Sequence, residues 1–295
     1  MICVLLNGGL GNQMFQYAFG RALSNKLHTE LFFDTSSLLN NNSEITIRSL
    51  ELGIFDLRIQ IACDKEIKQL KPLLYRIFNF IYYKLGFKGI QTSKYFIEKK
   101  NSYNESINKI SRDCYLNGYW QSYRYFQNVD SIIRQEFKFP LISENGNNET
   151  ITKIQKCNSI SLHIRRTDYV NNKNHDIHGT CSIEYYKRAA EYIAKRVSDP
   201  VFFIFSDDID WARTNLNLNY PCEFISGNIG DKSYIDMQLM SLCKHNIIAN
   251  SSFSWWGAWL NSNPNKIVIA PKRWFKDENL NKQTFDLIPK VWIRL

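Results

Sequence analysis

The chain has 295 residues, of which 44% are hydrophobic and 22% charged, enough for one large or two modest globular domains. This composition excludes a disordered or collagen-like protein, and no apolar run approaches the roughly 20 residues of a membrane-spanning helix. The net charge is +9, and the stretch from Lys65 to Arg112 holds 11 basic and 3 acidic residues. That stretch matches no nucleic-acid recognition pattern, so we expect an anionic substrate or membrane surface as its partner and no nucleic acid.

The first predicted elements are a strand over Ile2–Leu6, a glycine turn, a helix over Asn12–Leu27 and a strand over Leu31–Asp34. Beyond Asp34 the pattern becomes helical, basic and aromatic without a clear period. The N-terminus lacks the basic region of a signal peptide, and the seven cysteines lack metal-ligand spacing. We therefore expect a cytoplasmic protein.

The polar segment from Ser143 to Asn148 follows Pro140 and is the predicted linker between two domains, residues 1–150 and 151–295. The second half alternates between strands and helices. Strands are expected over Ser159–Ile164, Val201–Phe205, Cys222–Ile225, His245–Ala249 and, as the last, Lys266–Ala270; helices over Ser182–Val197, Ser206–Trp211, Lys232–Cys243 and Phe253–Leu260. This alternation predicts a parallel, doubly wound sheet, whose ligands bind at the carboxyl ends of the strands.

The run from His163 to Tyr169 follows an apolar strand and reads His-Ile-Arg-Arg-Thr-Asp-Tyr. Because side chains alternate along a strand, His163 and Arg165 share one face and Arg166 takes the other. Buried arginines need a carboxylate or a phosphate, so one arginine can meet a phosphate while the other packs against a group such as Asp168. The alternative is an internal Arg–Asp ion pair without a ligand.

Two further motifs lie at strand ends. Gly8–Gln13 is a glycine turn before a helix, and Asn250–Gly257 places serines at a helix start; both suit an anion, and both have ordinary structural readings as a tight turn and a serine cap. The glycine turn lacks the third glycine of a dinucleotide fingerprint. Asp208-Ile209-Asp210 has the form of a metal-binding DxD sequence, but its place at a helix start favours a capping role. We therefore expect no metal.

These motifs together resemble the bacterial α-1,2-fucosyltransferase family. The matching runs are Gly8–Gln13, Gly118–Ser122, His163–Tyr169, Phe203–Asp208 and Asn250–Gly257, in the family's order over nearly the whole chain. The resemblance implies a GT-B architecture, an α/β fold of two Rossmann-like domains facing a central cleft, with GDP-L-fucose held by the second. It implies inverting, metal-independent transfer of L-fucose to O2 of a terminal galactose on a glycan acceptor, with no cofactor.

Site residues follow from the resemblance position by position. The arginine matching Arg165 contacts the donor diphosphate in the wider superfamily, and the histidine matching His163 lies beside the nucleotide. Asp236 looks like the aspartate that reads guanine. The remaining donor contacts resemble Ser252, Phe253 and Ser254, and the acceptor side is assigned to Gly11, Asn12 and Trp120.

The catalytic base does not carry over. Some distant fucosyltransferases have a glutamate shortly after the arginine motif, where this chain reads Asn171-Asn172-Lys173, so Asp168 is the candidate. Tyr119, Trp120 and Tyr123 are candidate acceptor-stacking rings, and core packing explains them equally. The alternatives for function are a GDP-fucose-dependent transferase with another linkage or acceptor and a non-catalytic glycan-binding protein.

The basic stretch has two interpretations. Residues from Lys68 to Leu85 mix cations with aromatic rings at partly helical spacing, and Pro72 suits a first helical turn. One interpretation is a helix that covers the first domain. Because enzymes of this family often extend lipid-linked glycans, the other is weak peripheral contact of Lys65–Arg112 with the inner face of the membrane.

Overall fold

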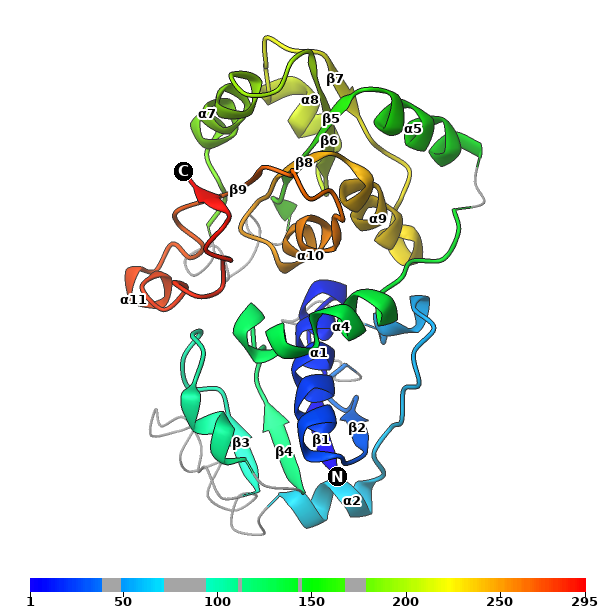
Figure 1. Cartoon of the computed structure of the whole chain (residues 1–295), viewed down its shortest axis with the longest axis vertical. Coiled ribbons are helices and arrows are strands. Elements are labelled where there is room, and N and C mark those ends of the chain that lie inside the picture. The colour runs from blue at the N-terminus through cyan, green and yellow to red at the C-terminus, as the bar shows by residue number, and fades with distance from the viewer. Residues whose placement is uncertain (39–48, 72–93, 111–112, 143–144, 168–178) are drawn as a thin grey trace. The chain divides into compact units, whose positions relative to one another are not determined.

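The computed structural model describes residues 1–38, 49–71, 94–110, 113–142, 145–167 and 179–295 (Figure 1). The chain forms two compact units. One unit comprises Met1–Lys138 with Phe285–Leu287, and the other comprises Phe139–Thr284 with Ile288–Leu295. The division therefore lies between Lys138 and Phe139, earlier in the chain than the boundary expected near residue 150.

The N-terminal unit contains a four-stranded parallel sheet in the order β2-β1-β4-β3. Its strands are β1 Ile2–Leu5, β2 Leu31–Asp34, β3 Tyr95–Ile97 and β4 Cys114–Asn117, and its α-helices are α1 Leu10–Leu27, α2 Asp64–Leu70 and α4 Asp130–Glu136. The predicted β1, α1 and β2 are confirmed. Helix α1 packs against β1, and its Phe15 and Phe19 are buried, with their rings against Phe126 and Trp120.

The C-terminal unit contains a six-stranded parallel sheet in the order β10-β9-β8-β5-β6-β7. Its strands are β5 Asn158–Ile164, β6 Pro200–Ser206, β7 Cys222–Phe224, β8 His245–Ile247, β9 Val268–Ala270 and β10 Ile293–Arg294. Its α-helices are α5 Asn145–Lys156, α7 Ile183–Ala194, α8 Ile209–Asn215, α9 Tyr234–Leu242, α10 Ser252–Leu260 and α11 Glu278–Asn281. Every predicted strand and helix of this half is confirmed. The strand expected over Lys266–Ala270 forms β9, but it is not the last, because β10 follows it and pairs with it.

Helices cover both faces of the C-terminal sheet, as its strand pattern requires. Leu162 and Ile204 point to the face packed by α7 and α8, and Phe203 and Phe205 point to the face packed by α9 and α5. All four side chains are fully buried. Because both faces are filled with apolar side chains, the polar motifs are left for the carboxyl ends of the strands.

The segment expected to be a linker is largely helical. From Asn145 onward it forms α5, whose Ile154 is fully buried in the cluster beneath α9. Most residues of this helix are polar, and only a few apolar side chains contact the core. The composition of the segment is therefore similar to that of a linker. The helix therefore belongs to the C-terminal unit.

Much of the basic stretch, including Pro72–Leu85, lies outside the described residues, so neither interpretation of it is tested. Its described part includes α2, β3 and a 3-10 helix over Glu105–Lys109. Among the described residues, no helix is long and apolar enough to cross a membrane. All seven cysteines are free.

Candidate active site

The arginine motif at the carboxyl end of β5 is held by an aspartate that follows β6. The two strands pair in parallel up to their last residues, so the residues that follow them lie side by side. The Asp207 carboxylate accepts hydrogen bonds from the backbone N–H of Arg166 at 2.8 Å and of Thr167 at 3.0 Å. Its Oδ2 also lies 3.3 Å from Nε of Arg165, whose side chain is 23% exposed. Asp207 thus fixes the turn and pairs with Arg165, a role that sequence reasoning missed.

Arg166 turns to the opposite face and is engaged in packing. Its guanidinium carbon lies 3.6 Å from the centroid of the Trp211 ring, and its Nε lies 3.6 Å from the Asp208 carboxylate. Asp208 also caps α8, because its Oδ1 accepts from the Trp211 N–H at 3.2 Å. The two arginines therefore diverge as strand alternation predicts, with Arg165 partly exposed at the strand end and Arg166 covering α8.

His163 is a neutral imidazole inside the unit. Burial lowers its pKa to about 3, although the Asp207 carboxylate opposes that shift and the Arg165 cation adds to it. Its ring lies 5.9 Å from the Phe253 ring, and Nδ1 has no hydrogen-bond partner among the described residues. Buried polar atoms in proteins are normally paired, so an unpaired imidazole nitrogen beside Arg165 is typical of a ligand site.

The serine motif forms the N-terminus of α10, which follows β8. Ser251 is the N-cap, and its Oγ accepts from the Phe253 N–H at 3.3 Å. The predicted donor contacts Ser252 and Phe253 are partly exposed, whereas Ser254 is buried and its hydroxyl donates to the Ser251 carbonyl. Because β8 pairs with β5, this helix start lies at the same sheet edge as the arginine motif. A helix N-terminus and an arginine together suit a diphosphate.

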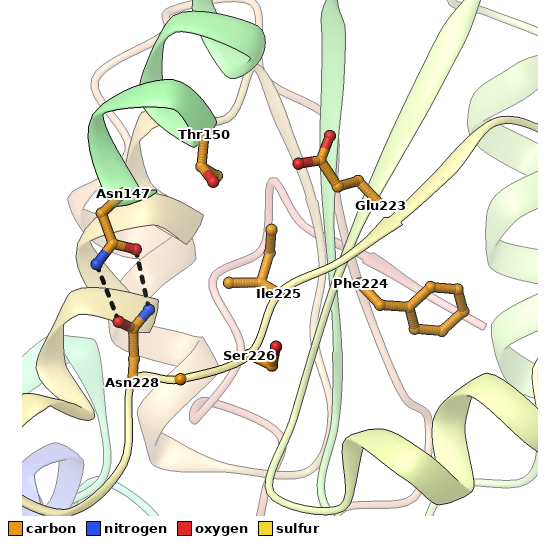
Figure 2. Close-up of a pocket in the computed structure, with 8 residues that line it drawn as sticks. Asn147, Thr150, Glu223, Phe224, Ile225, Ser226 and Asn228 are labelled. Carbon is orange, nitrogen blue, oxygen red and sulfur yellow. Dashed lines mark hydrogen bonds between the residues drawn. The ribbon is translucent and has the colours of Figure 1, made fainter. Parts of the chain in front are cut away.

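Asp236 lies in the first turn of α9, beside a pair of buried amides. Nδ2 of Asn228, in the loop after β7, donates to Oδ1 of Asp236 at 2.7 Å. Asn228 exchanges two further hydrogen bonds with Asn147 of α5, at 3.1 and 3.3 Å, as Figure 2 shows. Both amides line a hollow of about 310 Å³ at the end of β7. Burial raises the pKa of Asp236 to about 7, and the bond from Asn228 opposes the rise.

Helices α9 and α10 approach closely at Gly257. A Cβ on this residue would lie 2.9 Å from Cβ of Met240, closer than side chains pack. The glycine therefore allows α9 and α10 to pack closely.

In the N-terminal unit, the glycine turn and the Gly118–Ser122 segment are joined by a hydrogen bond. Nε2 of Gln121 donates to Oδ1 of Asn12 at 2.7 Å. Gly8 has a φ of +74°, and a Cβ there would lie 2.5 Å from Nδ2 of Asn12, so this position requires glycine. Gly11 is buried in α1. The acceptor role of Gly11 and Asn12 stays a prediction.

Trp120 faces the core. It is 2% exposed and packs against Phe19 at a ring-centroid distance of 4.8 Å, while its neighbour Tyr119 is 44% exposed. Trp120 has a φ of 55°, and its backbone N–H donates to the Glu98 carboxylate at 3.1 Å. Core packing, which explained this ring equally well from the sequence, accounts for the Trp120 ring in the structure, and Tyr119 is the ring presented to solvent.

Asp168, the candidate base, lies outside the described residues, as does the Asn171–Lys173 segment after it. Among the residues that the structure describes, no three His, Cys, Asp or Glu side chains gather as a metal site would require. Asp208 of the DxD-like sequence caps α8 and faces Arg166.

Comparison with known proteins identifies the family. The model of glycosyl transferase family 11 matches residues 1–295. The chain belongs to this family. It is 36% identical over 302 residues to an α-1,2-colitosyltransferase of Escherichia coli, covering 100% of this chain and 99% of that protein. It is 37% identical over 308 residues to the O-antigen biosynthesis glycosyltransferase WbnK of the same species, covering 98% and 99%.

Among solved structures, the chain resembles POFUT1 in complex with GDP-fucose. The TM-score is 0.50 at 12% sequence identity, and the match covers 91% of this chain and 97% of that chain. At this identity the likeness concerns the fold alone. The shared architecture is GT-B, which confirms the fold implied by the resemblance, and the protein is a glycosyltransferase.

Proposed function

We propose that this glycosyltransferase transfers L-fucose from GDP-L-fucose to O2 of a terminal galactose, with inversion at the fucose C1. The observation that carries the proposal is the edge of the C-terminal sheet where Arg165, paired with Asp207, lies with the N-terminus of α10. As the bond between C1 and the diphosphate breaks, negative charge grows on the GDP oxygens. A guanidinium and a helix N-terminus stabilise that charge.

The remaining roles are assigned by residue type and position. Asp236 would accept hydrogen bonds from the guanine edge, and His163 and Ser252 would complete the donor site. A carboxylate near the galactose O2 must take its proton as O2 attacks C1 from the face opposite the diphosphate. Asp168 is our candidate for that base, and the glycine turn with Asn12 is our candidate for acceptor binding.

Incubation with GDP-L-fucose and lactose tests the proposal. We expect release of GDP together with a fucosylated product whose glycosidic linkage, measured by NMR, is α-1,2 to galactose. A product with another linkage would favour the alternative of a GDP-fucose-dependent transferase that forms a different bond. A glycan-binding protein without catalysis would release no GDP above the hydrolysis seen without lactose.

A donor that carries colitose is the second candidate, favoured by the likeness to an α-1,2-colitosyltransferase over the whole chain. Colitose lacks the 3-hydroxyl of L-fucose. A site that hydrogen-bonds this hydroxyl strongly rejects a sugar that lacks it, whereas an apolar pocket only weakly rejects a sugar that carries it. Rates with GDP-L-fucose and GDP-L-colitose on the same acceptor decide between the donors. A larger kcat/KM for GDP-L-colitose would show that colitose, and not fucose, is the preferred sugar.

Transfer is expected to proceed without a metal ion, because arginine and a helix N-terminus supply the charge that a cation supplies in DxD enzymes. Activity measured after dialysis against EDTA should equal that of the untreated enzyme. Loss of activity with EDTA and its return with Mn²⁺ would contradict this expectation and return Asp208-Ile209-Asp210 to consideration as a metal ligand.

We further propose a cytoplasmic location with weak contact between the basic stretch Lys65–Arg112 and an anionic membrane surface, which would bring the active site to a lipid-linked acceptor glycan. Each basic side chain near an anionic surface contributes about 1 kcal/mol, an attraction that salt screens. Co-sedimentation should therefore be larger with anionic than with neutral vesicles and should fall at high salt. Equal recovery with both kinds of vesicle would leave packing as the role of this stretch.

A further inference from the structure

The amide of Asn228 has a single orientation that its partners dictate. Its side chain is 8% exposed, and Nδ2 donates to both Asp236 and Asn147 while Oδ1 accepts from Asn147. The ionised form of the Asp236 carboxylate only accepts hydrogen bonds, so with that form the Nδ2 end of Asn228 must face Asp236. Asn147 then fits in one orientation only, with its oxygen toward the second N–H of Asn228. The donor that reaches Asp236 is therefore fixed from two sides, by α5 and by the loop after β7 (Figure 2).

We propose that the Asn147–Asn228 pair positions the Asp236 carboxylate to read guanine and so determines the nucleotide selectivity of this enzyme. This inference rests on the proposed GDP-linked donor. Guanine presents a ring N–H and an exocyclic amine side by side, and a carboxylate accepts from both only when its plane is aligned with that edge. A 2.7 Å hydrogen bond to one oxygen restrains rotation of the carboxylate plane. Asn228 and Asn147 are thus positioning residues, and Asp236 is the residue that touches the base.

Burial and Asn228 are the influences on the charge of Asp236. Burial raises the pKa of Asp236 to about 7, and donation from Asn228 favours the ionised form. The charged groups on neighbouring elements are the exposed Glu149, Lys153 and Lys156 on α5, the exposed Asp231 and Lys232 on the 3-10 helix Gly230–Lys232, and the partly exposed Glu223 on β7, which pairs with Lys153. Helix α10 carries no titratable side chain. Removal of Asn228 is therefore expected to move the ionisation of Asp236 to higher pH.

Calorimetric titration of the whole enzyme with GDP, IDP and ADP between about pH 6 and pH 8.5 tests the proposal. IDP lacks the exocyclic amine, and ADP lacks the donor pattern altogether. For Asn228→Ala we expect GDP affinity to fall roughly tenfold near pH 7, since hydrogen bonds to charged groups contribute on that order. The loss should be smaller at pH 8.5, where the carboxylate is ionised again, and the preference for GDP over IDP should shrink.

Two other variants make the result decisive. Asn147→Ala leaves Asn228 in place but removes its support, so the same changes are expected at smaller size, and this variant decides if Asn228→Ala does not fold. Asn261→Ala is the matched control, because it removes a buried amide that bonds Asn246 and the Cys243 carbonyl. It should lower thermal stability without moving the pH dependence of GDP binding.

Nucleotide binding by the parent enzyme distinguishes a wrong donor from a wrong positioning role. If the parent binds ADP as well as GDP, the proposed donor is wrong, whatever the variants do. Suppose instead that the parent prefers GDP. If folded Asn228→Ala or Asn147→Ala then has the same GDP affinity, pH profile and GDP-to-IDP affinity ratio as the parent, the positioning role is overturned while the proposed function stands.

Discussion

Replacement of Arg165 by alanine is expected to reduce the rate of sugar transfer by roughly 30-fold to several thousand-fold, the equivalent of about 2–5 kcal/mol for removing one partner of a desolvated charge pair. The guanidinium lies at the carboxyl end of β5, partly exposed and 3.3 Å from Asp207. Charge on the departing diphosphate is greater in the transition state than in the bound donor, so most of the loss should fall on kcat. Initial rates of GDP release at saturating donor measure it.

Two variants separate this effect from a general loss of structure. Arg165→Lys keeps the positive charge but loses the fork of N–H donors, so its rate should lie between those of the parent and the alanine variant. Arg188→Ala removes an exposed arginine on α7 and should leave the rate unchanged. Near-parental turnover by folded Arg165→Ala would rule out the diphosphate role, and the Arg165–Asp207 pair would then be an internal ion pair.

The C-terminal sheet could be predicted because its central strands are short apolar runs between helices with clear periods. β6 contains four consecutive fully buried residues, Phe202–Phe205, a pattern that a strand covered on both faces requires. β3 and β4 have three and four residues in basic, aromatic sequence, and β10 has two, so no period develops. These strands form because they pair with strands far away in the sequence, and the local sequence contains no signal of that pairing.

The location of the candidate site could be predicted from the sequence, but which side chains bond one another there could not. Parallel strands bring their carboxyl ends together, so the motifs after β5 and β8 were expected at one edge. That Asp207 binds Arg165 depends on the register between β5 and β6. The inward turn of Trp120 depends on a left-handed backbone and on Glu98, which follows β3. Neither feature has a signal within its own segment.

Asp236→Asn is expected to weaken GDP binding by roughly 10- to 150-fold, because hydrogen bonds to a charged group contribute about 1.5–3 kcal/mol. An amide offers one oxygen, so it cannot accept from both the ring N–H and the exocyclic amine of guanine. Its N–H groups also suit the acceptor on the adenine ring, so the preference for GDP over ADP should shrink. Calorimetry with both nucleotides measures the two effects.

The same substitution should raise the stability of the unliganded protein, which separates a binding role from a structural one. Burial raises the pKa of Asp236 from 3.8 to about 7 in the folded state. The unfolded chain therefore loses this proton first, and the free energy of unfolding falls as pH rises between these values and stays lowered above them. Asparagine carries no charge, so Tm at about pH 8 should exceed that of the parent, with the difference vanishing below about pH 4.

Weaker GDP binding with a higher Tm is the pattern of a residue kept for its ligand at the expense of stability. A lower Tm together with unchanged GDP affinity would show that Asp236 stabilises α9 and does not read the base.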